Sequence, residues 1–195
     1  MNEKPIWKKN LLVLSIAVFI AGIAFSEVMP FLPLYIDTLG NFTHKQLNFW
    51  SGFIYSGTYF VSAIISPWWG KLADKKGRKP MTLRASLGMA IVLGCMGLVT
   101  NVYQLFILRM LQGIFAGFVS NSNALVATET PKEKSGQALG TMASSFTAGN
   151  LLGPFIGGAL ASIFSYRVTF FITGGLLLIA FFCHCSLSMK QTSSQ

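Results

Sequence analysis

Six long apolar segments, separated by short polar connections, constrain this chain of 195 residues more than any other feature. A helix that crosses the hydrocarbon core of a bilayer needs about 20 predominantly apolar residues. Six stretches meet this requirement, at about residues 10–36, 48–69, 81–100, 103–126, 137–162 and 167–188. We therefore predict an all-α membrane protein in which residues 1–195 form a single bundle of six transmembrane helices.

The composition excludes most soluble classes of protein. Charged residues make up 11% of the chain and apolar residues 52%, whereas about a quarter of a soluble domain is charged. A net charge of +9 would suggest nucleic-acid binding in a soluble protein. Here the cations lie in short clusters between the apolar segments, so we predict contact with a lipid bilayer and not with nucleic acid.

The distribution of lysine and arginine predicts the orientation. If both termini are cytoplasmic, 12 of the 15 cations lie on the inner side: Lys4, Lys8, Lys9, Lys71, Lys75, Lys76, Arg78, Lys79, Arg84, Lys132, Lys134 and Lys190. Cytoplasmic connections of membrane proteins carry such an excess. We predict a multi-pass protein of the plasma (inner) membrane with its N-terminus and C-terminus inside.

The connection between the second and third segments carries a specific motif. Residues 70–80 read Gly-Lys-Leu-Ala-Asp-Lys-Lys-Gly-Arg-Lys-Pro. Every defined position matches the loop G-x-L-x-D-x-x-G-R-K, so the chain resembles the major facilitator superfamily. The resemblance implies a gating loop formed by Gly70, Asp74, Gly77, Arg78 and Lys79. A basic loop with one solvated acid is the alternative, and Glu129 either pairs with Arg78 or is solvated.

Two further segments support this resemblance. In the fourth apolar segment, Arg109 precedes Gln112-Gly113, as in the superfamily's span-4 motif. In the fifth, the pattern G-x-x-x-G-P-x-x-G-G is similar to the superfamily's antiporter motif, with Gly149, Gly153, Pro154, Gly157 and Gly158 at its defined positions. Within the superfamily that motif marks drug:proton exporters and implies a helix face that seals the cavity against proton leak.

The resemblance implies a transporter, not an enzyme, and no cofactor. Its members have twelve spans in two halves, each a 3+3 inverted repeat, with the substrate site between them. This chain resembles the N-terminal half, and the second bundle is absent. We expect proton-coupled efflux of small amphipathic drugs by alternating access, with a second six-helix half or a homodimer as partner. The alternative is a non-transporting half, or a membrane interaction protein that needs a partner bundle.

Two ionisable residues lie deep within the apolar segments. A charge at the bilayer centre costs about 2.5–3.5 kcal/mol on insertion scales, so such residues usually face a cavity or a partner. At 1.5 Å per residue, Glu27 lies about 13 Å and Arg109 about 12 Å from the outer end. We expect Glu27 to bind a proton or a cationic drug, with its proton affinity set by desolvation and by Arg109. A static Glu27–Arg109 pair that joins two helices is the alternative.

Other polar and aromatic residues within the apolar segments are further candidates for a binding site. Tyr55 and Tyr59 share a helix face and either contact an aromatic drug or pack. Asn121 and Asn123 either line a substrate path or form interhelical hydrogen bonds. Cys183, His184 and Cys185 are adjacent in one helix, where their side chains point to different faces, so no metal site is predicted. The sequence also shows no nucleophile–base pair and no phosphate-binding loop.

Overall fold

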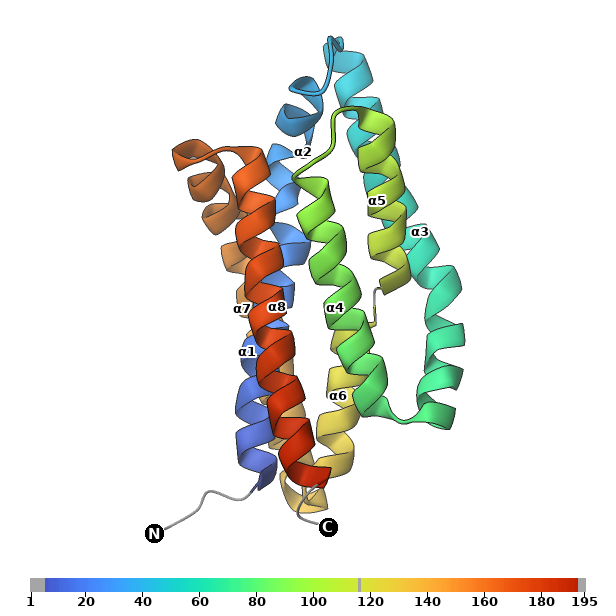
Figure 1. Ribbon diagram of the computed structural model, residues 1–195, viewed down its shortest axis with the longest axis vertical. Coiled ribbons are helices and arrows are strands. Elements are labelled where there is room, and N and C mark those ends of the chain that lie inside the picture. Colours follow the sequence, from blue (N-terminus) through green and yellow to red (C-terminus); the bar gives the residue numbers. More distant parts are fainter. Residues whose placement is uncertain (1–5, 116, 193–195) are drawn as a thin grey trace.

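The computed structural model describes residues 6–115 and 117–192, with side chains described for residues 7–115 and 117–182. The described chain folds into helices, in the order α1 (Ile6–Ser26), α2 (Val28–Asp37), α3 (His44–Lys76), α4 (Arg78–Met96), α5 (Val102–Phe115), α6 (Phe118–Glu129), α7 (Lys132–Ile163) and α8 (Tyr166–Thr192). No strand occurs among these residues. The predicted all-α class is confirmed, and Figure 1 shows the helices side by side in one elongated bundle.

Two of the six apolar segments are broken helices. The first consists of α1 and α2, which meet at Glu27, and Pro30 and Pro33 remove backbone donors just after this break. The fourth consists of α5 and α6, and Gly117 precedes α6 with a φ of 111°. A left-handed φ suits glycine because it has no Cβ. The other four segments correspond to α3, α4, α7 and α8.

Length and apolar composition alone identify fewer spans than six. Within the described chain, three helical stretches are long and apolar enough to cross a membrane: Trp7–Ser26, Val102–Glu129 and Lys132–Ile163. Val28–Asp37 and Tyr166–Phe182 are shorter apolar helices. The division into six spans therefore stays a prediction, supported by the parallel arrangement of the helices in Figure 1.

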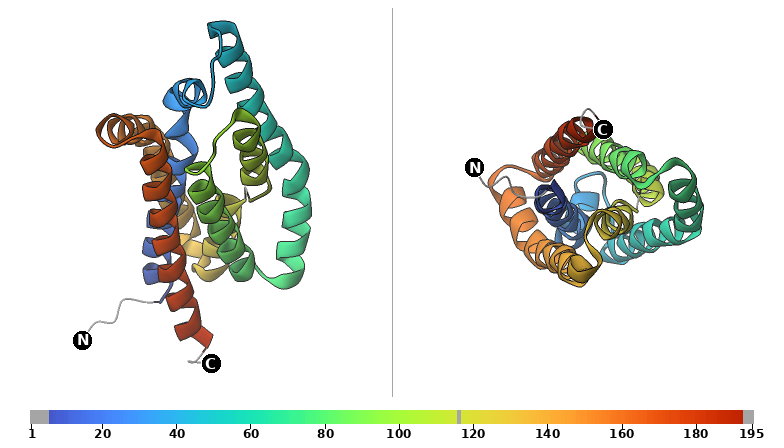
Figure 2. Two further views of the ribbon diagram at one scale, coloured as in Figure 1. Left: turned by 45° about the horizontal axis from the view of Figure 1, so that its top comes forward. Right: turned by 90° about the horizontal axis from the view of Figure 1, so that it is seen from below.

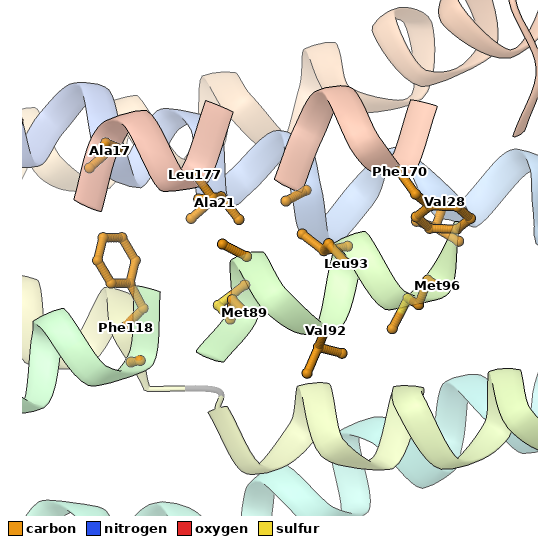
Figure 3. Packing of buried hydrophobic residues seen from close by; sticks show 14 of the residues in the cluster. Ala17, Ala21, Val28, Met89, Val92, Leu93, Met96, Phe118, Phe170 and Leu177 are labelled. Carbon is orange, nitrogen blue, oxygen red and sulfur yellow. The ribbon is translucent and has the colours of Figure 1, made fainter. Parts of the chain in front are cut away.

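The helices surround a core that lies between α1, α4 and α8. Figure 3 shows Ala21 from α1 and Leu177 from α8 together, facing Met89 and Leu93 of α4. Ala17 of α1 lies opposite Phe118 of α6 in the same view. In the end-on view of Figure 2 the helices form a ring, in which α7 runs beside α1 and α8 runs beside α4. The hydrophobic effect does not drive helices together within lipid, so close packing of this kind stabilises the association of the helices.

The ends of several helices meet at one end of the bundle. There α1 begins, α3 turns into α4, and α6 leads into α7 (Figure 1). The α3–α4 turn is a single residue, Gly77, whose φ of 92° suits glycine. Lys8, Lys76 and Lys132 belong to this end, because they lie near the start of α1, at the end of α3 and at the start of α7. Its cytoplasmic location stays a prediction from the charge distribution.

Candidate functional site

Glu27 lies at the break between α1 and α2, and its side chain is fully buried, with 0% exposed. Its backbone N–H donates to the carbonyl of Ile23 at 2.8 Å, so the helical path continues through the break. Its carboxyl Oε2 lies 2.7 Å from the hydroxyl Oγ1 of Thr173 on α8. Its other oxygen, Oε1, is buried without a hydrogen-bond partner among the described residues.

The glycines of the α7 motif form the wall behind Glu27. A Cβ on Gly157 would lie 2.7 Å from the Cβ of Glu27 and 2.9 Å from its carbonyl oxygen. A Cβ on Gly153 would overlap the hydroxyl of Ser26, and one on Gly149 would overlap the carbonyl oxygen of Phe19. The backbones of α1 and α7 therefore touch along this face, which only glycine permits.

One glycine of the same motif does not share in this contact. A Cβ on Gly158 would meet nothing within 4 Å, although Gly158 is adjacent to Gly157 in sequence. Pro154 lies inside α7 and is only partly buried. The motif therefore combines a packing face, built from every fourth residue, with a glycine that has open space beside it.

Arg109 on α5 is the second buried ionisable residue, with 4% exposed. Its Nη1 donates to Oε1 of Gln112 at 2.9 Å. Its Nε and Nη2, and the amide nitrogen of Gln112, are buried without partners. A guanidinium with free donors is able to accept a hydrogen-bonding ligand or to change partners.

Glu27 and Arg109 are both buried and do not form an ion pair with each other. The ion pairs of the described chain, defined by N···O distances up to 4.0 Å, join Arg78 to Asp74 and Lys79 to Glu129. A static Glu27–Arg109 bridge, the alternative to a functional role, is therefore not formed in this structure.

A tyrosine pair borders Arg109. The rings of Tyr55 and Tyr59 on α3 lie 5.7 Å apart between centroids. A small pocket is lined by both tyrosines and Arg109 together with Phe25, Ile54 and Thr58. Tyr55 and Tyr59 thus contact the same pocket as the buried arginine, as their four-residue spacing allows.

A larger cavity of about 480 Å³ adjoins these residues and is lined by α1, α3, α5, α6 and α7 together with Gly117. This volume is typical of a small-molecule site. Tyr59 and Asn123 line it, and the amide oxygen of Asn123 is buried without a partner. Asn121 is buried, with 4% exposed, and is not part of this lining. The other lining residues are Phe25, Thr58, Ser62, Ser66, Gly113, Gly117, Val119, Ser120, Phe146 and Asn150.

The α3–α4 loop forms local contacts at the basic end of the bundle. Arg78 donates to the carboxylate of Asp74, one helical turn earlier, and both side chains are partly exposed. Glu129 accepts from Asn10 at 2.7 Å and lies 3.4 Å from the ammonium of Lys79. Glu129 therefore joins α6 to α1 through Asn10 and to α4 through Lys79. The alternative pair of Glu129 with Arg78 is not formed in the described chain.

The two glycines of the predicted gating loop differ in their surroundings. Gly77 forms the turn, whereas a Cβ on Gly70 would meet nothing within 4 Å. Among the residues that the structure describes, no group of three or more His, Cys, Asp or Glu side chains could hold a metal ion. The side chains of Cys183, His184 and Cys185 lie outside the described residues.

Comparison with known proteins identifies the family. The family model described as Major Facilitator Superfamily matches residues 14–191. The chain therefore belongs to the major facilitator superfamily, and the resemblance seen in its motifs is confirmed. This membership supports a membrane location and a non-enzymatic role.

Curated relatives of high similarity cover most of this chain. It is 53% identical over 182 residues to the multidrug resistance protein MdtG of Escherichia coli O1:K1 / APEC and, equally, of E. coli strain K12 / DH10B. The match covers 93% of this chain and 45% of each relative. The chain thus spans less than half the length of these relatives.

A solved structure confirms the fold. The crystal structure of the human organic anion transporter MFSD10 (TETRAN) superposes with a TM-score of 0.78 at 21% sequence identity. The match covers 93% of this chain and 48% of that one. At this identity the likeness shows the fold alone, which is that of one half-bundle of the superfamily.

Proposed function

We propose that this chain is the N-terminal half of a proton-coupled exporter of small amphipathic drugs. The observation that carries the proposal is the complete burial of Glu27, with no cation within ion-pair distance among the residues that the structure describes. Phe25, two residues earlier in the chain, lines a cavity of ligand size. An ionised carboxylate buried in this way is costly, whereas a protonated one is not. Glu27 therefore takes up a proton when its site closes and releases it when the cavity opens to water.

The lining of the large cavity supports a drug-like substrate. Phe25, Tyr59 and Phe146 supply aromatic surface, and Ser62 and Asn123 supply hydrogen-bonding groups. The described lining residues include no charged side chain. A cavity of this kind selects amphipathic molecules by shape and apolar contact. The printed name of the MdtG relatives, multidrug resistance protein, agrees with this substrate class.

Transport requires a second bundle, which we propose to be another six-helix half or a second copy of this chain. Large apolar side chains are exposed on α3 and α7, including Phe60, Trp68 and Phe155. Alternating access then arises as the two bundles rock around the cavity. Asp74 and Arg78, together with the Gly77 turn, form the cytoplasmic latch of that motion.

Efflux from bacteria tests this function. The chain is expressed in an Escherichia coli strain that lacks its drug pumps, alone and together with the part of MdtG that lies beyond the matched region. We expect ethidium efflux with the second half present, abolished by a protonophore and by Glu27→Gln. Efflux that continues unchanged in the Glu27→Gln variant would exclude Glu27 as the coupling carboxyl.

A further inference from the structure

The hydroxyl of Thr173 faces two acceptors with a single hydrogen to donate. Its Oγ1 lies 2.7 Å from Oε2 of Glu27 and 3.1 Å from the backbone carbonyl oxygen of Thr169. Thr173 is itself buried, with 1% exposed. A hydroxyl carries one donor and two acceptor lone pairs. The proton on Glu27 therefore decides how this three-atom array is hydrogen-bonded.

When Glu27 is protonated, every member of the array is satisfied. The carboxyl O–H donates to Oγ1 of Thr173, and the Thr173 hydroxyl donates to the carbonyl of Thr169. When Glu27 is ionised, the Thr173 hydroxyl must turn to the carboxylate and abandon Thr169. The carboxylate then has one hydrogen bond, and its Oε1 stays buried without a partner.

We propose that Thr173 is the positioning residue for the proton on Glu27, and that its hydroxyl turns between Glu27 and Thr169 as that proton is released and rebound. The inference rests on the proposed function, because it takes Glu27 as the proton site of the exporter. It links proton release to α8, since each change at Glu27 changes the hydrogen bonding of that helix.

The other groups packed around Glu27 offer no competing proton partner. From α7, Gly153 and Gly157 approach with backbone only. From α1, the hydroxyl of Ser26 bonds to the carbonyl of Gly22 at 2.9 Å. From α5, Arg109 is hydrogen-bonded to Gln112 and forms no ion pair with Glu27. Thr173 is therefore the described side chain that contacts the carboxyl.

Infrared difference spectroscopy tests the proposal on the purified 195-residue chain in phospholipid vesicles. Spectra are compared between acidic and alkaline buffer, and the carbonyl-stretch band of the protonated Glu27 carboxyl is identified by its loss in Glu27→Gln. We expect Thr173→Val, which keeps the side-chain shape, to move this band to higher frequency because the carboxyl O–H loses its acceptor. Thr173→Ser restores the hydroxyl and the original frequency.

Thr169→Val is the matched control. The Thr169 hydroxyl donates to the carbonyl of Ser165 at 3.0 Å, and Thr169 is equally buried one turn away on α8. It should leave the Glu27 band unmoved. Should Thr173→Val fail to fold, Thr173→Ala supplies the same loss of the hydroxyl.

The possible outcomes separate the inference from the proposed function. A Glu27 band that stays at the same frequency without the Thr173 hydroxyl overturns the inference, as does the absence of any band that depends on Glu27. A band that depends on Thr173, in a chain whose ethidium efflux is insensitive to Glu27→Gln, supports the hydrogen-bond array and overturns the transport proposal alone.

Discussion

At the scale of residues, the site consists of two buried charges with different local partners. The carboxyl of Glu27 is held by α8, whereas the guanidinium of Arg109 is held within α5 by Gln112. Each retains buried polar atoms without partners. Such atoms are costly when they stay unsatisfied, so both groups are able to gain a further hydrogen-bonding partner.

The hydrogen bonding of Arg109 predicts that a positive charge alone does not support efflux at this position. Its planar guanidinium donates to Gln112 and keeps two further nitrogens for another partner, whereas a lysine ammonium is a point charge. We expect Arg109→Lys to reduce ethidium efflux by about tenfold or more, the factor that ~1.4 kcal/mol supplies. Arg167→Lys is the control, because Arg167 on α8 donates to the carbonyl of Val99, which follows α4, and forms no hydrogen bond with Gln112. Equal efflux by both variants would show that Arg109 contributes only its charge.

The sequence identifies these two charges, and Gln112 beside Arg109 in the span-4 motif, but it does not identify the partner of Glu27. Glu27 and Arg109 stand out because charged residues are rare in apolar segments. Thr173 does not, since threonine is ordinary in a membrane helix and its role depends on the register of α8 against α1. Asn121 and Asn123 show the same difficulty: both are polar residues of one helix, yet only Asn123 lines the large cavity.

At the scale of elements, α7 determines how α1 is held. Gly149, Gly153 and Gly157 are four residues apart, which places them on one helix face, and that face meets the backbone of α1 from Phe19 to Glu27. The same spacing is visible in the sequence, but the identity of the opposing helix is not. Pro30 and Pro33 indicate in the sequence that the helix is loosened beside Glu27. The break before α6 is not visible there, because the segment stays apolar across it.

Two adjacent glycines of α7 are expected to respond oppositely to one added methyl group. Gly157→Ala places its Cβ against the backbone of Glu27 and should destabilise the fold by about 1–3 kcal/mol, the usual cost of overpacking. Gly158→Ala has open space and should be neutral, or stabilising by up to about 1 kcal/mol through helix propensity. Thermal unfolding of the two variants in detergent measures the difference. Equal melting temperatures would contradict the tight α1–α7 contact.

At the scale of the whole molecule, the bundle is shaped around one large cavity. The large cavity draws on five helices that are distant in sequence, which is why composition and periodicity predict the helices but not the cavity. The charge asymmetry, by contrast, is a property of segment ends and is readable from the sequence.

The most direct test of the account measures proton movement that a drug induces. Everted membrane vesicles containing the chain with its second half are energised, and a fluorescent pH probe records the response to added ethidium. The account predicts that ethidium drives protons out of the vesicles and that Glu27→Gln abolishes this response. Proton movement of undiminished size in the Glu27→Gln variant would contradict the claim that Glu27 carries the coupled proton.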